Sequence, residues 1–164
     1  KKGISFREAH GIVAKVESSM IDLGIVEAPV TNQDLDIDVF RSDELVLIVH
    51  PNHALAKKDS VKPSDILGLP FITREEGSGT KAVMFDYFTK NNIDRNSLNV
   101  CMELGNSESI KGAVETGIGV SILSKTTIEK ELQLNRLSFV PLMPKSHRNV
   151  PRPRYLFLIQ HLGN

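Results

Sequence analysis

Apolar positions along the chain fall into two kinds of stretch, one typical of strands and the other of helices. Residues 44–49 form a nearly continuous apolar run, as expected for a strand that is covered on both faces. Residues 108–117 instead place apolar and small side chains at the i, i+3, i+4, i+7 spacing of one helix face. Because stretches of the two kinds alternate, the pattern predicts an α/β fold of mainly parallel sheets flanked by helices.

The same pattern gives approximate bounds for the individual elements. Strands are expected at residues 4–6, 22–27, 44–49, 69–73, 100–104, 120–123, 137–142 and 155–160. Helices are expected at residues 9–20, 63–67, 80–91, 108–117 and 125–133. The polar segment at residues 32–38 is expected to be irregular. Two long stretches, near residues 41–46 and 150–156, are candidates for strands that cross between two lobes.

Composition places the chain among soluble globular proteins. It has 164 residues, 40% of them apolar and 24% charged, with 20 basic and 20 acidic side chains. This balance lacks the basic footprint of a surface that binds nucleic acid unaided, so any DNA contact is expected outside this chain. No run approaches the roughly 18 apolar residues of a membrane span, and the first residues do not form a signal peptide. A cytoplasmic location without membrane contact is expected.

The sequence offers little chemistry of its own. Cys101 is the only cysteine and lies in a segment that predicts a buried strand, so a disulfide framework is excluded. His50 and His53 flank a turn, but no third ligand is near them in sequence, and a metal site is not expected. No nucleophile, base and orienting partner form a recognisable set. Neither an enzyme nor a cofactor is therefore expected.

A glycine-rich turn is the main candidate for a binding site. Gly77, Ser78, Gly79 and Thr80 follow an apolar strand and open a helix. Helix starts leave backbone N–H groups unpaired and carry about half a positive charge, so this turn suits a carboxylate, a sulfate or a phosphate-like group. The glycines allow close approach of the backbone, and Ser78 and Thr80 offer hydroxyls. An ordinary helix cap has the same pattern and remains the alternative.

Two further helix starts accompany this turn. Asn106 and Ser107 open the helix after residues 100–104, and Ala9 and His10 open the first helix. Ligands of parallel sheets settle at the carboxyl ends of the strands, so the three starts would face one ligand if they converge. Asn106 and Ser107 are expected to cap their helix in either case. A protonated His10 would donate to an anion, or it is simply solvated.

Carboxylates restrict the charge of the expected ligand. Four glutamates crowd the ends of the same strands, namely Glu27, Glu75, Glu76 and Glu103. They disfavour a bare, multiply charged anion unless Arg74 and Lys81 compensate, and they favour an ammonium group. A zwitterionic amino-acid derivative, a carboxylate and a sulfate-like ion all stay open as ligands.

Several short motifs occur in an order that is specific as a set. They lie at residues 21–27, 43–49, 51–56, 70–75, 77–80, 103–111 and 113–124. Together they closely resemble the effector-binding domain of LysR-type transcriptional regulators, over residues 4–160. Within this family the sequence looks most similar to regulators of sulfur assimilation and related metabolism. The family's DNA-binding domain, the first strand and helix of its first lobe and the closing helix of that lobe have no counterpart in this chain.

The resemblance implies a two-lobed fold like that of type 2 periplasmic binding proteins, with an incomplete first lobe at residues 1–42 and 153–164 and a second lobe at residues 43–152. It implies a small-molecule effector between the lobes, a homodimer or homotetramer, and DNA contact through a winged helix-turn-helix domain upstream. The effector site implied by the family comprises Gly77 to Thr80, Asn106 and Ser107, Ala9 and His10, and the strand end at Glu27 and Pro29. Where the family often has Asn or Thr, this chain has His10.

A solute-binding receptor of an ABC transporter shares this fold and is the alternative function. It would carry an export signal and act as a monomer. The residues upstream of Lys1 would distinguish the two functions, because one predicts a helix-turn-helix pattern there and the other a signal peptide.

Overall fold

The computed structural model describes residues 6–26, 34–143 and 154–161, and the chain falls into two compact units. Unit 1 comprises Lys1–Asp43 and Pro153–Asn164, and unit 2 comprises Glu44–Arg152. Each unit has its own strands and its own buried apolar core. Among the described residues, no helix combines the length and the apolar character needed to cross a bilayer.

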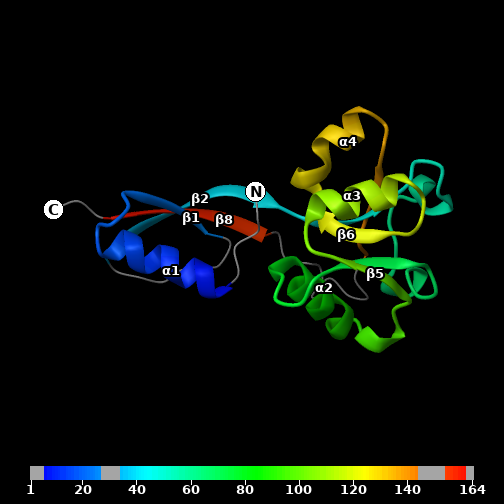
Figure 1. The fold of residues 1–164 in the computed structure, drawn as a ribbon, viewed down its shortest axis with the longest axis horizontal. Coiled ribbons are helices and arrows are strands. Elements are labelled where there is room, and N and C mark those ends of the chain that lie inside the picture. Colours follow the sequence, from blue (N-terminus) through cyan, green and yellow to red (C-terminus); the bar gives the residue numbers. More distant parts are fainter. Residues whose placement is uncertain (1–5, 27–33, 144–153, 162–164) are drawn as a thin grey trace. The chain divides into compact units, whose positions relative to one another are not determined.

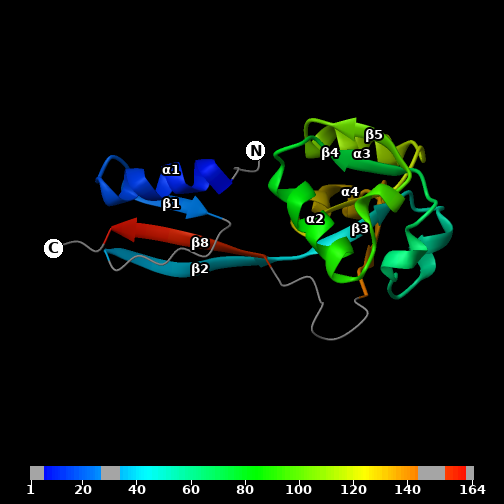
Figure 2. The ribbon, with the colours of Figure 1, turned by 90° about the horizontal axis from the view of Figure 1, so that it is seen from below.

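In the described part of unit 1, a helix packs on a three-stranded sheet. Its elements are α1 (Phe6–Glu17), β1 (Leu23–Val26), β2 (Leu35–Asp43) and β8 (Arg154–His161). The strand β8 lies between β1 and β2 and runs antiparallel to both. Figure 2 shows α1 lying along this sheet, where Val16 packs with Leu35 and Ile159 in the small core.

The described residues of unit 2 form five strands in two sheets. They are β3 (Leu45–Val49), β4 (Phe71–Arg74), β5 (Val100–Leu104), β6 (Ser121–Ser124) and β7 (Ser138–Pro141). One sheet has the order β6-β3-β7, in which β3 pairs antiparallel with both neighbours, and the other consists of β4 and β5, which pair parallel. An isolated parallel bridge between Phe71 and Val120 connects the two groups of strands.

Helices cover both faces of these strands (Figure 1). They are α2 (Gly79–Lys90), α3 (Ser107–Glu115) and α4 (Glu129–Gln133), with 3-10 turns η1 (Ala54–Lys57), η2 (Pro63–Asp65), η3 (Arg95–Ser97) and η4 (Lys125–Ile128). All five residues of β3 are buried. Leu47 joins the core under α2, and its neighbour Ile48 joins the core under α3. The continuous apolar run therefore reflects a central strand with helices on both sides.

The expectation of mainly parallel strands is wrong for the described residues, where four of the five strand pairings are antiparallel. In each antiparallel case the paired strands are not linked as a strand, helix, strand unit: β8 pairs with β1 and β2, and β3 pairs with β6 and β7, which lie far from it in sequence. The expectation that residues 32–38 are irregular is also wrong in part, because β2 begins at Leu35. The apolar side chains of Leu35, Ile37 and Val39 alternate with aspartates, which is the period of a half-buried strand.

Two smaller expectations also fail. The first helix begins at Phe6 and ends at Glu17, earlier at both ends than predicted, so Phe6 does not belong to a strand. Residues 4 and 5 of that expected strand lie outside the described residues. Cys101 is exposed, because β5 pairs on one side with β4 and has no second neighbour among the described strands. Apolar composition alone does not distinguish such an edge strand from a central one.

Candidate functional site

Two neighbouring strands of unit 2 each lead directly into a helix. The strand β4 ends at Arg74 and is followed by α2, and β5 ends at Leu104 and is followed by α3. Because β4 and β5 are parallel neighbours, the starts of α2 and α3 lie at the same edge of the sheet. A backbone bond joins the two connections, since the N–H of Glu75 donates to the carbonyl of Leu104 over 3.3 Å.

The connection before α2 is the glycine-rich turn. Gly77 has a φ of +84°, a backbone conformation that glycine adopts without strain. The N–H of Ser78 donates to the carbonyl of Glu75 at 3.2 Å, which closes the turn. Ser78 is the N-cap residue of α2, but its side chain makes no capping hydrogen bond. Its hydroxyl is therefore not explained by helix capping.

The start of α3 has a different arrangement. Asn106 is the N-cap residue, and its side-chain oxygen accepts a hydrogen bond from the N–H of Ser109 at 2.8 Å. Asn106 thus has the capping role that the sequence predicts. The hydroxyl of Ser107 accepts a hydrogen bond from Nη1 of Arg74 at 3.3 Å. The last residue of β4 is in this way bonded to the first residue of α3.

Arg74 is the cation between the two helix starts. Its side chain is 10% exposed and forms a two-pronged contact with Glu75, from Nε to Oε2 at 2.7 Å and from Nη2 to Oε1 at 2.8 Å. The hydrogen bond to Glu75 raises the pKa of Arg74 above its usual value. The same hydrogen bond lowers the pKa of Glu75, so the pair is ionised at neutral pH.

Lys81 is the second cation near the start of α2. Its side chain is 7% exposed, and Nζ lies 2.8 Å from Oε1 of Glu76 and 2.7 Å from Oε2 of Glu103. Burial lowers the pKa of Lys81, but the hydrogen bonds to the two carboxylates outweigh burial, and the pKa is raised. Both cations predicted to compensate an anion are therefore already paired with glutamates. The backbone N–H groups remain the main donors of this edge.

A groove of about 530 Å³ lies beside α2, on the side that carries Lys81. Its lining includes Thr73, Lys81, Phe85 and Glu103. Thr73 is 2% exposed, and its hydroxyl has no hydrogen-bond partner among the described residues. None of the predicted effector-site residues lines this groove.

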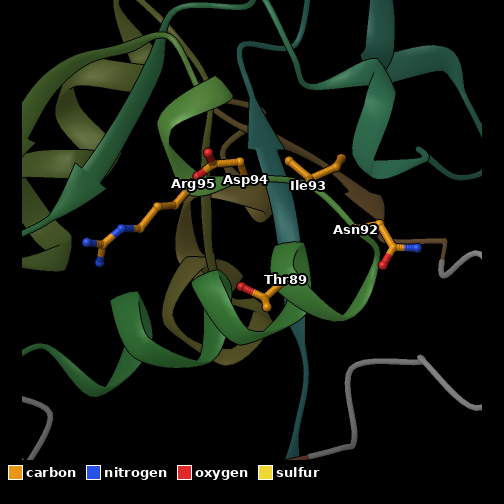
Figure 3. Close-up of a pocket in the computed structure, with 5 residues that line it drawn as sticks. All are labelled: Thr89, Asn92, Ile93, Asp94 and Arg95. Carbon is orange, nitrogen blue, oxygen red and sulfur yellow. The ribbon is translucent and has the colours of Figure 1, made fainter.

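A second hollow, of about 390 Å³, lies at the other end of α2. Thr89, Asn92, Ile93, Asp94 and Arg95 line it, and Figure 3 shows the Arg95 side chain extending away from the other four. Asp94 uses a carboxylate oxygen to accept the N–H of Asn96 at 3.0 Å. This hollow is therefore built from a helix end and a capped turn, and no predicted effector-site residue belongs to it.

The remaining predicted site residues belong to unit 1. Ala9 and His10 do not form a helix start, because α1 begins at Phe6 and their N–H groups fall beyond its unpaired first turn. The expectation that these two residues open the first helix is therefore wrong. Glu27 and Pro29 lie outside the described residues. In unit 2, the ring Nδ1 atoms of His50 and His53 accept backbone N–H bonds within their turn.

Sequence reasoning missed the contacts that fix α3. Lys111 is 6% exposed, and its Nζ donates to Oε1 of Glu131 at 2.9 Å and to the carbonyl of Thr127 at 3.1 Å. Glu108 approaches the same nitrogen at 2.9 Å. The signal was present in the sequence, because Lys111 lies one helical turn before Val114 on the buried side of α3. A charge at such a position indicates a buried partner, although it does not identify Glu131.

Comparison with known proteins identifies the family. Residues 3–160 match the model of the LysR substrate binding domain, so the chain belongs to this family. This match confirms the family resemblance seen in the sequence. It also confirms the expected fold, because LysR effector-binding domains have the α/β fold of type 2 periplasmic binding proteins.

Individual relatives agree with this assignment. The chain is 33% identical over 162 residues to the uncharacterized HTH-type transcriptional regulator YeiE of Escherichia coli (strain K12), which covers 98% of this chain and 53% of that protein. It is 34% identical over 138 residues to a probable RuBisCO transcriptional regulator of Synechocystis sp., covering 82% of this chain and 40% of that protein. The chain thus spans about half the length of such relatives, or less.

A solved structure resembles the chain as well. The regulatory domain of Synechocystis PCC6803 CcmR in complex with 2-PG has a TM-score of 0.72 and 29% sequence identity. The match covers 94% of this chain and 70% of that chain. None of these relatives supports the alternative of a transporter receptor.

Proposed function

We propose that this chain is the ligand-sensing regulatory domain of a LysR-type transcriptional regulator. A small polar or anionic effector binds at the edge of unit 2 where α2 and α3 begin, and its binding shifts the regulator between two arrangements. The effector can do so only through different affinities for the two arrangements. The family and the two bacterial relatives named as regulators support this proposal.

One observation supports the location of the site above all others. The two connections at the starts of α2 and α3 are bonded to each other, through Glu75 to Leu104 and through Arg74 to Ser107. Two sets of unpaired backbone N–H groups are thereby brought to one edge, where they favour a negatively charged or strongly polar group. The hydroxyl of Ser78, which does not cap α2, adds a donor at the same place.

The charges around this edge support a ligand of low net charge. Arg74 and Lys81 are each held by glutamates, so a multiply charged anion would meet carboxylates rather than unpaired cations. A carboxylate or a zwitterionic amino-acid derivative fits better, whereas a sulfate-like dianion requires that Arg74 or Lys81 be released from its glutamates. The 2-PG complex of the CcmR regulatory domain makes 2-PG a sensible first probe.

The rest of the proposal follows the family. Ala9 and His10 of α1, and Glu27 and Pro29 after β1, are the candidates for effector contact in unit 1. The working form is a homodimer or homotetramer in the cytoplasm, and DNA is contacted through a winged helix-turn-helix domain outside this chain. The protein acts by binding, without catalysis and without a cofactor.

Ser78 separates this proposal from plain helix capping. If its hydroxyl contributed a cap, S78A would cost about 1 kcal/mol of stability. Because no capping bond is present, we expect the free energy of unfolding of S78A to lie within about 0.5 kcal/mol of that of the parent protein. We expect S78A nevertheless to bind the effector about fivefold to tenfold more weakly. Thr89, an exposed hydroxyl residue at the other end of α2, provides the matched control T89A.

Calorimetry on the purified protein tests both parts. The ligands are sulfate, phosphate, acetate, glycine, serine and 2-PG, and urea unfolding gives the stability of each variant. Binding of at least one ligand, weakened by S78A and unchanged by T89A, supports the proposal. If no ligand binds, the sensing function is contradicted. If S78A loses stability but not affinity, the location of the site is contradicted.

A further inference from the structure

The contact between Arg74 and Glu75 leaves some of the hydrogen-bond donors of Arg74 unused. The two residues are neighbours in sequence, and the carboxylate takes two of the five N–H bonds of the guanidinium. Ser107 accepts a third. Two N–H bonds of Arg74 therefore have no partner among the described residues. The guanidinium is held in place with part of its donor capacity unused.

The two partners differ in how firmly they are fixed. The Arg74 side chain is 10% exposed and is anchored at the end of β4 by its bond to Ser107. The Glu75 side chain is 39% exposed, so its carboxylate can leave Arg74 and be hydrated by solvent instead. A ligand carboxylate, sulfate or phosphate presents the same oxygen geometry that Glu75 presents to Arg74. Such a ligand can take the place of Glu75, whereas the guanidinium stays where it is.

We propose that Arg74 recognises the anionic group of the effector and that Glu75 is a built-in competitor for the same guanidinium. This inference rests on the proposed function and adds a residue that sets the specificity of the site. Glu75 keeps the charge of Arg74 neutralised while no effector is bound. It also lowers the apparent affinity for every anion, because an anion can bind only in the fraction of molecules in which Glu75 does not occupy Arg74.

The position of Arg74 gives this exchange a consequence. Arg74 is bonded to Ser107 at the start of α3, and Glu75 is bonded through its backbone to Leu104 and to Ser78. An anion that replaces the Glu75 side chain therefore contacts a guanidinium that is already attached to the start of α3. It lies beside the turn that opens α2. The exchange couples ligand binding to the edge where both helices begin.

A neighbouring residue provides a matched control. Glu76 is the next residue in the chain and carries the same charge, but its carboxylate pairs with Lys81 instead of Arg74. E75Q and E76Q thus change the net charge of the same turn by the same amount. Only E75Q removes the competitor of Arg74. A general electrostatic effect would appear equally in both variants, whereas competition would appear in E75Q alone.

Titration with inorganic sulfate, inorganic phosphate and 2-PG tests the inference on the purified protein, by calorimetry and by the Nε–H resonance of Arg74. We expect E75Q to bind at least one of these anions about tenfold more tightly than the parent protein, on the order of a Glu75 occupancy of nine-tenths. E76Q should change the affinity by less than about twofold. The double variant R74Q/E75Q should lose the gain, and the Arg74 resonance should move on titration in the parent protein and in E75Q.

Each outcome decides the matter. Equal affinities of E75Q and E76Q, or an R74Q/E75Q variant that keeps the tight binding, would overturn the role of Arg74. A parent protein that binds an anion without any gain in E75Q contradicts this inference while the sensing function stands. If neither the parent protein nor E75Q binds any of the three anions, the inference is also wrong. Binding of glycine or serine in the wider calorimetric series would then leave the proposed function in place. Thermal unfolding shows whether each variant is folded, and R74K/E75Q replaces R74Q/E75Q if the latter is not.

Discussion

The buried ion pair that anchors α3 gives a prediction with a large expected effect. Lys111 on α3 and Glu131 on α4 have side-chain exposures of 7% and 10% and are joined at 2.9 Å. Lys111 also donates to the carbonyl of Thr127. The second oxygen of Glu131, Oε2, is buried without a partner among the described residues. Replacing Lys111 by Met would leave a buried carboxylate with neither oxygen paired to a side chain.

The expected cost of K111M follows from this geometry. Breaking a buried pair by removing one partner typically costs 3–5 kcal/mol, because the other charge stays buried. We expect the lower end, about 3 kcal/mol, since the Glu131 side chain retains a little exposure. Glu108, the other carboxylate at Lys111, is 80% exposed and returns to solvent at little cost. With a typical urea dependence of about 2 kcal/mol/M, the midpoint should fall by about 1.5 M.

The pH dependence of stability gives a second, independent test of the Lys111–Glu131 pair. Burial raises the pKa of Glu131, but the hydrogen bond from Lys111 and further backbone and charge interactions outweigh burial and lower it. A carboxyl group with a lowered folded pKa stabilises the protein above its unfolded pKa of about 4.3, and this contribution is lost as the pH falls through the folded value. Without Lys111, burial, the largest influence on the pKa of Glu131, is opposed only by a backbone hydrogen bond and the charge of Lys130, so we expect the pKa to rise and the carboxylate to destabilise increasingly as the pH rises. The difference between the parent protein and K111M should therefore shrink from pH 7 to pH 3.

Urea unfolding followed by circular dichroism, repeated between pH 3 and pH 7, measures both effects. Lys90, which pairs with Asp86 at side-chain exposures of 60% and 56%, supplies the control K90M, expected to cost less than about 0.5 kcal/mol. The double variant K111M/E131L should recover most of the loss, because no unpaired charge remains. A loss for K111M no larger than for K90M, or a difference that grows toward low pH, would show that Lys111 does not stabilise an ionised, buried Glu131.

Three further substitutions test local features of unit 2 by urea unfolding. G119A should destabilise by about 1–3 kcal/mol, because a Cβ there would lie 2.6 Å from the backbone oxygen of Pro70; a cost below 0.5 kcal/mol would contradict this close approach. G77A should cost about 1–2 kcal/mol, because of its φ of +84°, and G77N should cost less; equal costs would argue against backbone strain. N106A should cost about 1 kcal/mol, because the hydrogen bond from Ser109 is lost, and N106D should keep this bond. An N106A variant as stable as the parent protein would contradict the capping role of Asn106.

Local patterns in the sequence predicted much of unit 2. The apolar run at β3 and the helical spacing of α3 each come from burial of a single element, and such signals are readable without knowing the partner. The strand β2 failed for the opposite reason. Its alternating aspartates look like a loop unless Leu35 and Ile37 are recognised as one face of a strand, and it pairs with β8 from the far end of the chain.

The candidate site was predictable to a similar degree. The glycine turn and the cap at Asn106 are short-range features, and the structure places both helix starts at one edge. The bond from Arg74 to Ser107 spans 33 positions and depends on the register of β4 and β5, which no local pattern specifies. Long-range contacts of this kind decide which charges at this edge are neutralised, and so which ligands the proposed site would accept.

Amide resonances of the protein during titration with 2-PG and with sulfate show whether one ligand contacts the starts of both α2 and α3. We expect the N–H signals of Gly79, Thr80 and Ser107 to shift first and together, with a single affinity, while those of Thr89 and Asn92 at the far end of α2 stay unchanged. Shifts confined to the far end of α2, or to the start of only one of the two helices, would contradict a shared site at the beginnings of α2 and α3.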